Sequence, residues 1–385
     1  MKRFLSIIIL LVMLTGCAHN DDSGDDNVSI SELSKSKQEC IDDIKSIKLD
    51  NITVSEDFWL GLADELGIYQ IKCIDGFENK ADKLFEKYIP ANLMSKNKIT
   101  DDKSSYPFGP SFKDQDNKLS VSVGCTGFFS YYNSESEFTQ NLMYKNEIYK
   151  YSADKTLLSW NDERNRNLIL GSTKTTLGEM IERIESFRNG FIKAADYPTN
   201  LKTGRVYIYT DEKGNNIVKT EQLPVFKDVP INPVAKRYND EPNSLGRIPT
   251  AYTFADGSSD VSVFITQYAF EEYKTVKTID SVISPVDALK KLSEKLAAHI
   301  DLNLLGAQLV YNSKYVGSCE PAHEGSSHRD TAPWSMCCSY DIFELEPCWL
   351  FWFDAAENKE VCATVNCVTA DVTFIDNRDS SLSGV

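Results

Sequence analysis

Histidine and positive charge are both scarce in this sequence. Among 385 residues there are 4 histidines, and 41 Lys and Arg stand against 57 Asp and Glu, for a formal net charge of −16. A net negative chain repels phosphate backbones, so nucleic acid is not expected as a partner. Beyond the N-terminus no apolar run approaches the length of about eighteen residues that a membrane-spanning helix needs, which excludes a polytopic membrane protein.

The sequence patterns of common catalytic sites are also missing. The serine-hydrolase pattern G-x-S-x-G, the metalloprotease pattern H-E-x-x-H, the Walker loop and the dinucleotide pattern G-x-G-x-x-G do not occur. His323 and His328 miss the four-residue spacing that would place both imidazoles on one face of a helix. We therefore predict no catalytic residue, and a hydrolase without a recognisable signature is the alternative.

The N-terminus joins a basic pair, an apolar stretch and a cysteine. Lys2 and Arg3 precede an apolar run that ends in Leu14-Thr15-Gly16-Cys17. This arrangement resembles the signal and lipobox of bacterial lipoproteins. The resemblance implies that residues 1–16 are removed and that the Cys17 thiol receives a diacylglycerol. We therefore expect an extracytoplasmic protein whose first partner is the lipid bilayer of the cell membrane.

Four further segments follow the signal. Residues 17–32 are acidic and without apolar periodicity, which predicts a solvated tether. Residues 33–110 are predicted to be rich in helix, residues 111–274 to form a mixed domain, and residues 275–378 to form a C-terminal domain.

Local signals support this division. In the first folded segment we predict a helix that Ser55 caps and Gly67 ends, with Phe58, Trp59, Leu62 and Leu66 on one face. In the last, Ser284-Pro285 has the composition of a helix start, and strands are predicted on both sides of that helix. The expected fold class is α+β: a helical N-terminal part, a mixed middle domain and a C-terminal antiparallel sheet packed on a helix.

Three short motifs of the last hundred residues resemble a known family. They are Ile283-Ser284-Pro285-Val286-Asp287-Ala288-Leu289, Leu345-Glu346-Pro347-Cys348-Trp349 and Val365-Asn366-Cys367-Val368-Thr369-Ala370-Asp371-Val372. They are similar to motifs of PepSY-like domains and YycH/YycI-type regulatory proteins, and the whole chain resembles uncharacterised lipoproteins of Gram-positive bacteria. The resemblance implies an extracytoplasmic module that binds or restrains another protein, and it implies no catalytic residues. Ala370 departs from the family pattern, because glycine is usual there.

Cysteines and histidines gather in one segment near the C-terminus. With Cys17 lipidated, nine of the 10 cysteines remain, and an odd number cannot all pair within the chain. Cys319, His323, His328 and Cys337 offer the thiolates and imidazoles that zinc prefers, although their spacing matches no standard zinc motif. Zinc binding, disulfides and free thiols all stay open for this segment, and no other cofactor is predicted.

An aromatic run gives the last candidate site. Trp349, Phe351 and Phe353 alternate with Leu350 and Trp352, and apolar residues on both faces predict a strand buried on both sides of a sheet. The alternative is that Trp349, Phe351 and Phe353 contact a partner. The favoured function is a non-enzymatic binding or regulatory lipoprotein for a membrane or cell-wall protein. The alternatives are a cell-envelope hydrolase and a metal-binding lipoprotein.

Overall fold

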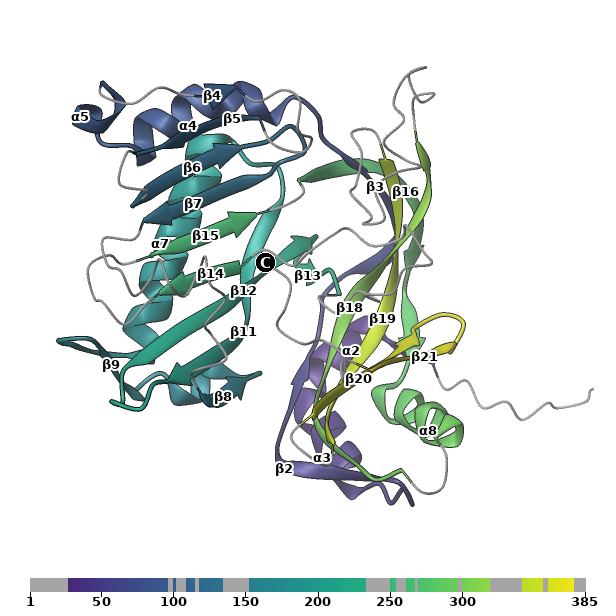
Figure 1. Ribbon diagram of the computed structural model, residues 1–385. Helices are drawn as coiled ribbons and strands as arrows, with labels where there is room; N and C mark the ends of the chain where they lie inside the picture. Colours follow the sequence, from purple (N-terminus) through teal and green to yellow (C-terminus); the bar gives the residue numbers. More distant parts are fainter. Residues whose placement is uncertain are drawn as a thin grey trace, which may run out of the picture.

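Two large sheets, each with its own core, organise the part of the protein that the structure describes, together with two pairs of short strands (Figure 1). The computed structural model describes residues 27–95, 100–101, 109–114, 118–133, 152–232, 250–253, 261–266, 269–296, 300–318, 341–355 and 359–376. Strands outnumber helices, and the predicted α+β class is confirmed. No helix among these residues is long and apolar enough to span a membrane.

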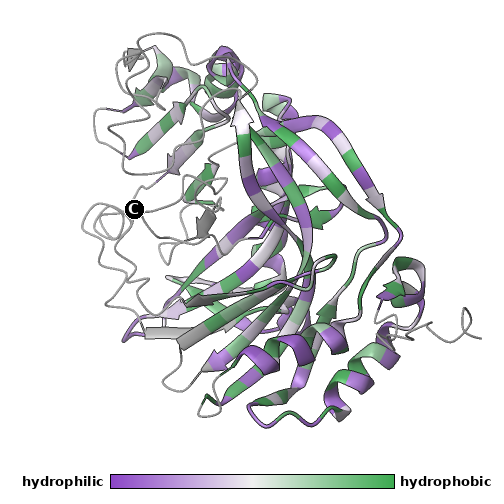
Figure 2. Cartoon of the chain, turned by 90° about the vertical axis from the view of Figure 1, so that its right-hand side faces the viewer, coloured by the Kyte–Doolittle hydropathy of each residue, from purple (hydrophilic) through white to green (hydrophobic). Residues whose placement is uncertain are grey.

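The first unit is built from the N-terminal and the C-terminal parts of the described chain. Its sheet has the order β16-β3-β19-β18-β2, with β20 paired to β19 and β21 paired to β20, and every pair is antiparallel except β18 with β2. The strands are β2 (Ile52–Gly61), β3 (Leu66–Cys73), β16 (Phe270–Ile279), β18 (Leu302–Ser318), β19 (Asp341–Ala355), β20 (Lys359–Asn366) and β21 (Val372–Asp376). Hydrophobic and hydrophilic residues alternate along these strands (Figure 2).

Helices α2 (Ile30–Lys35), α3 (Lys37–Ser46) and α8 (Pro285–Lys295) pack on one face of this sheet. The predicted start of α8 is confirmed, because the Ser284 hydroxyl accepts a hydrogen bond from the Asp287 amide at 3.0 Å. Proline at the first helical position has no amide hydrogen to leave unpaired. These local signals place α8 under the sheet, where Leu289 and Leu292 are buried.

The second unit is formed by the middle of the chain. Its main sheet holds β4 (Thr100–Asp101), β5 (Pro110–Lys113), β6 (Leu119–Val123), β7 (Phe129–Asn133), β15 (Val263–Thr266), β14 (Thr250–Thr253), β12 (Asn216–Phe226), β11 (Asn200–Thr210) and β8 (Ser152–Leu157) in that order, with β13 (Val229–Pro230) beside β12. Helices α4 (Ala81–Tyr88) and α7 (Leu177–Ala195) cover one face (Figure 1). A hairpin of β9 (Asn167–Leu170) and β10 (Thr173–Thr176) leads into α7, and α5 (Ala91–Met94) follows α4.

Helix α7 begins at a capping box. The Glu179 amide donates to the Thr176 hydroxyl, and the Glu179 carboxylate accepts from the Thr176 amide at 3.0 Å and from the Thr175 hydroxyl at 2.8 Å. The bond from the Thr176 backbone, with that from Thr175, lowers the pKa of Glu179. The Glu179 carboxylate is therefore ionised at neutral pH and stabilises the first turn of α7 as a hydrogen-bond acceptor.

One predicted helix is wrong. The segment from Ser55 to Gly67 forms the end of β2 and the start of β3, not a helix, so the first folded segment is less helical than expected. Phe58 and Leu60 are buried two residues apart, which is the period of a strand, and β2 pairs with β18 from the far end of the chain, with Leu60 opposite Ala307. Tertiary pairing outweighs a local helical pattern, because it supplies both backbone hydrogen bonds and a buried face.

The tether is shorter than predicted. Strand β1 (Asn27–Ser29) pairs with β17 (Ser281–Ile283), and Ser29 caps α2 with Glu32 as its reciprocal partner. Residues 27–32 are therefore folded rather than part of a solvated linker.

The turn after β20 forms although Ala370 replaces the glycine usual in the resembled family. Ala370 has a φ of 59°, in the left-handed region, and its amide donates to the Asn366 carbonyl at 3.0 Å. A β-carbon is strained in this conformation by about 1 kcal/mol. We therefore expect Ala370→Gly to raise the free energy of unfolding by up to about 1 kcal/mol, measured by urea denaturation. The matched change Ala363→Gly, at a buried position in β20, should lower it.

Candidate functional site

Most of the candidate residues lie outside the described part of the chain. These are Cys17, Cys319, His323, His328 and Cys337, so lipidation and zinc binding stay predictions. Among the residues that the structure describes, no three His, Cys, Asp or Glu side chains form a metal-binding group. Cys73, at the end of β3, is disulfide-bonded, which shows that the fold accommodates an oxidised cysteine.

The buried cysteines of the first unit behave as small apolar residues. Cys362 and Cys367 are 0% and 2% exposed and belong to opposite faces of the sheet, as the five-residue spacing predicts. Burial raises the pKa of the Cys348 thiol and of the Cys367 thiol. Both thiols therefore stay protonated and are poor nucleophiles.

The aromatic run on β19 is core. Trp349 and Phe351 are 0% exposed and Phe353 is 1% exposed, so these side chains do not form a binding surface and that alternative is wrong. Trp349 packs beneath the sheet and its indole Nε1 donates to the Ile283 carbonyl at 2.9 Å. The prediction of a strand buried on both sides is confirmed, because Leu350 and Trp352 are also buried.

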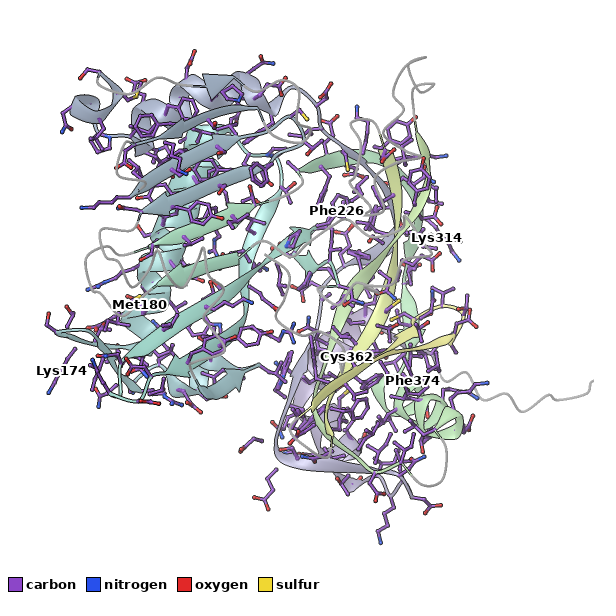
Figure 3. All side chains as sticks on the ribbon, viewed as in Figure 1. Lys174, Met180, Phe226, Lys314, Cys362 and Phe374 are labelled. Atoms are coloured by element: carbon purple, nitrogen blue, oxygen red, sulfur yellow. The ribbon has the colours of Figure 1, made fainter. Side chains whose placement is uncertain are left out.

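The opposite face of the same sheet meets the second unit. Its buried residues are Val310, Cys348, Leu350, Trp352 and Cys362, with Trp59, Leu158 and Leu305 packed against them. Leu158 follows β8 of the second unit, so the two units share this apolar cluster. Figure 3 labels Cys362 on the strand that carries this face.

A buried ion pair adjoins this cluster. The guanidinium of Arg205 on β11 donates to both carboxylate oxygens of Glu221 on β12, at 2.7 Å each, and the two side chains are 11% and 6% exposed. The Tyr207 hydroxyl donates to Glu221 at 2.9 Å. The Arg205 guanidinium also lies 4.7 Å from the ring centroid of Trp352. A planar guanidinium can pair and stack at once, so Arg205 joins the second unit to the first.

Two indole groups in this contact are not fully paired. Nε1 of Trp59 and Nε1 of Trp352 are buried and have no hydrogen-bond partner among the described residues. A buried unpaired donor costs about 1–3 kcal/mol. Apolar burial and the Arg205 ion pair therefore hold this contact, rather than a complete hydrogen-bond network.

A second contact between the units lies around β13. Phe226, Val229 and Ile231 from the second unit belong to the core of the first, and Ile231 forms a parallel bridge with Tyr311. The side-chain amide of Asn232 donates to Asn312 at 2.7 Å. The two units are therefore in contact both at the cluster around Trp352 and around β13, and these contacts fix one unit against the other.

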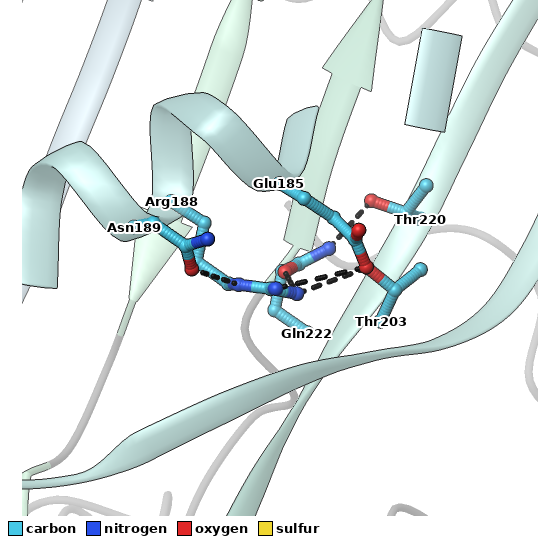
Figure 4. A network of polar contacts seen from close by, with 6 residues as sticks. All are labelled: Glu185, Arg188, Asn189, Thr203, Thr220 and Gln222. Atoms are coloured by element: carbon cyan, nitrogen blue, oxygen red, sulfur yellow. Dashed lines mark hydrogen bonds and ion pairs between the residues drawn. The ribbon is translucent and has the colours of Figure 1, made fainter. Parts of the chain in front are cut away.

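A polar network inside the second unit is centred on Arg188 (Figure 4). Arg188 of α7 is 7% exposed, and its guanidinium donates to the Thr203 hydroxyl at 3.0 Å and to the Gln222 carbonyl at 3.2 Å. Glu185 lies 3.6 Å away and also accepts from Thr203. Burial lowers the pKa of Arg188 while Glu185 opposes the shift, and an arginine stays charged in either case. The network fastens α7 to β11 and β12.

Sequence reasoning missed Arg205, Glu221 and Arg188. Each is a charged residue in a strand or helix that gives no local sign of burial, and only the approach of a second element removes it from water. All three are engaged within the protein, so their geometry indicates that they position structural elements rather than carry acid–base chemistry. Arg205 links the two units, and Arg188 holds α7 to the sheet of its own unit.

Comparison with known proteins adds information on the fold only. The chain is similar to a solved structure of an uncharacterised protein from Eubacterium rectale ATCC 33656, with 11% sequence identity and a TM-score of 0.56. The match covers 88% of this chain and 98% of that one, so both units have counterparts there. No family model and no curated protein matches the sequence.

Proposed function

We propose that this protein is an extracytoplasmic lipoprotein that binds or regulates a membrane or cell-wall protein without catalysing a reaction. The observation that carries the proposal is the lipobox Leu14-Thr15-Gly16-Cys17 behind a basic and apolar signal. Ten residue steps separate Cys17 from Asn27, where β1 begins, so the tether reaches at most about 35 Å. Anchoring would keep the β1–β17 end near the lipid and let neighbouring proteins meet the rest of the fold.

The geometry of the units supports a binding role. Three buried charged side chains join elements of the described fold: Arg205 pairs with Glu221 between strands, and Arg188 links helix and sheet. Two units held together by such contacts present a preformed surface to a partner, so less conformational entropy is lost by the protein when the partner binds. The PepSY-like motifs of residues 275–378 agree with this role.

The test is capture of the partner from the native membrane. The anchored protein is cross-linked in intact cells, solubilised and purified, and the co-purified proteins are compared with those of an unrelated lipoprotein of the same membrane. We expect one membrane or cell-wall protein to be enriched and to bind the purified lipoprotein directly. Turnover of peptidoglycan or peptide by the purified protein, abolished by one substitution, would establish the hydrolase alternative instead.

A further inference from the structure

The turn that joins β12 to β13 is strained. Phe226 pairs with Val229, so Lys227 and Asp228 form a two-residue hairpin turn. Their φ angles are 45° and 65°, which places both residues in the left-handed region. Asparagine and glycine are usual in such a turn, because a β-carbon is crowded in this conformation. Turn propensity therefore does not account for the lysine at the first position.

The ammonium of Lys227 lies against the first unit. Its Nζ is 4.2 Å from the ring centroid of Tyr69 on β3, 3.7 Å from Oε1 of Glu272 on β16 and 4.0 Å from Oε1 of Glu65. The contact adjoins Phe226, labelled in Figure 3, whose ring centroid lies 5.1 Å from that of Tyr69. A cation of the second unit is thus received by an aromatic ring and two carboxylates of the first.

Both carboxylates are oriented by hydroxyl groups. The Tyr69 hydroxyl donates to Glu65 at 3.3 Å, and the Thr275 hydroxyl donates to Glu272 at 3.0 Å. In the pairing of β16 with β3, Thr275 lies opposite Tyr69 and Glu272 lies opposite Ile71. Tyr69 and Ile71 are two residues apart and share one face of the sheet, so their two partners lie on that face as well. The sheet therefore builds a cation site around Tyr69.

The strain of the turn and the contacts of the lysine are of similar size. Two residues with a β-carbon in the left-handed region oppose the turn. One cation–π contact and two ion pairs favour it, and solvent reaches these pairs, because the side chains of Lys227, Glu272 and Glu65 are 32%, 42% and 64% exposed. Salt weakens exposed ion pairs and leaves backbone strain unchanged. Ionic strength can therefore shift the balance.

We propose that Lys227 is a salt-sensitive latch between the two units. With its ammonium on Tyr69, the turn is held in its strained conformation and β13 stays against the first sheet. When salt screens the carboxylates, the lysine leaves Tyr69 and the turn relaxes, while the buried side chains of Phe226, Val229 and Ile231 keep the units together. The inference does not depend on the membrane anchor or on the identity of a binding partner.

Hydrogen exchange of residues 225–232 tests the latch. The Ile231 amide donates to the Pro224 carbonyl, and the Asn232 amide donates to the Tyr311 carbonyl, both at 2.8 Å, so both bonds report whether β13 is docked. Mass spectrometry follows the exchange of the purified full chain in about 0.05 M and about 1 M NaCl. We expect the higher salt to speed exchange of this segment about five- to tenfold and to leave α7 unaffected.

Two substitutions separate the charge from the strain. Lys227→Met removes the charge and keeps an unbranched side chain, so exchange in low salt should be as fast as that of the wild type in high salt and should respond less to salt. Lys227→Asn also removes the charge but places a residue that tolerates the left-handed region at that position. It should therefore exchange more slowly than Lys227→Met. Glu272→Gln removes one carboxylate of the site and should lie between the wild type and Lys227→Met.

Controls distinguish the latch from a general loss of stability. Lys174→Met makes the same change in the β9–β10 hairpin, at the far side of the second unit in Figure 3, and should exchange as the wild type does. Thermal midpoints and the exchange of α7 identify any variant whose whole fold is weakened. Equal exchange of the wild-type segment in low and high salt would overturn the proposal. So would a Lys227→Met protein that is as protected or as salt-sensitive as the wild type, or a Lys227→Asn protein that exchanges no more slowly than Lys227→Met.

Discussion

Replacing Cys17 by serine is expected to abolish stable membrane attachment. The serine hydroxyl cannot form the thioether to diacylglycerol, and the remaining apolar stretch of residues 5–14 is too short to span a bilayer. Each acyl methylene buried in lipid contributes roughly 0.8 kcal/mol, so losing two acyl chains removes nearly all of the anchoring free energy. Fractionation with an alkaline wash should move the protein from pellet to supernatant.

A neighbouring substitution controls for this experiment. Ala18→Ser adds a hydroxyl one residue later and keeps the thiol, so this variant should stay in the membrane pellet. Intact mass spectrometry should find a diacylglycerol on the first residue of the wild type and of Ala18→Ser only. An unmodified, uncleaved wild-type N-terminus in the cytosol would remove the basis of the proposed function.

Trp349→Ala is expected to lower the free energy of unfolding by about 3–5 kcal/mol. The indole is 0% exposed, and its Nε1 donates to the Ile283 carbonyl, so the truncation opens a cavity and leaves that carbonyl unpaired. Because β17 also pairs with β1, the loss should loosen the end of the fold where the tether enters. Urea denaturation followed by circular dichroism measures the change.

An exposed aromatic residue on the same sheet is the matched control. Tyr273→Ala removes a side chain that is 50% exposed and should change stability by less than about 0.5 kcal/mol. Trp349→Phe keeps most of the apolar volume and should fall between the two. If Trp349→Ala kept native stability but lost a binding partner, the core assignment of the β19 aromatics would be wrong.

Local sequence signals predicted the elements that they encode directly. Ser284 and Pro285 start α8 and the apolar run of β19 is buried on both faces, both as predicted, and the capping box at Thr176 and Glu179 starts α7. These signals work because a cap or an alternation involves residues within one or two turns of each other. The helix expected from Ser55 failed because the partner that makes β2 a strand, β18, lies near the other end of the chain.

The features of the candidate site also fall into those that the sequence predicts and those that need the tertiary structure. The sequence by itself determined the acidic charge, the lipobox at Cys17 and the apolar character of β19, since each is a property of consecutive residues. Only the tertiary structure decided that Trp349 is core, that Arg205 pairs with Glu221 against Trp352, and that β16 has β3 as its one neighbour among the described strands. Burial and edge position depend on which distant strands pack together, and no short stretch of sequence contains that information.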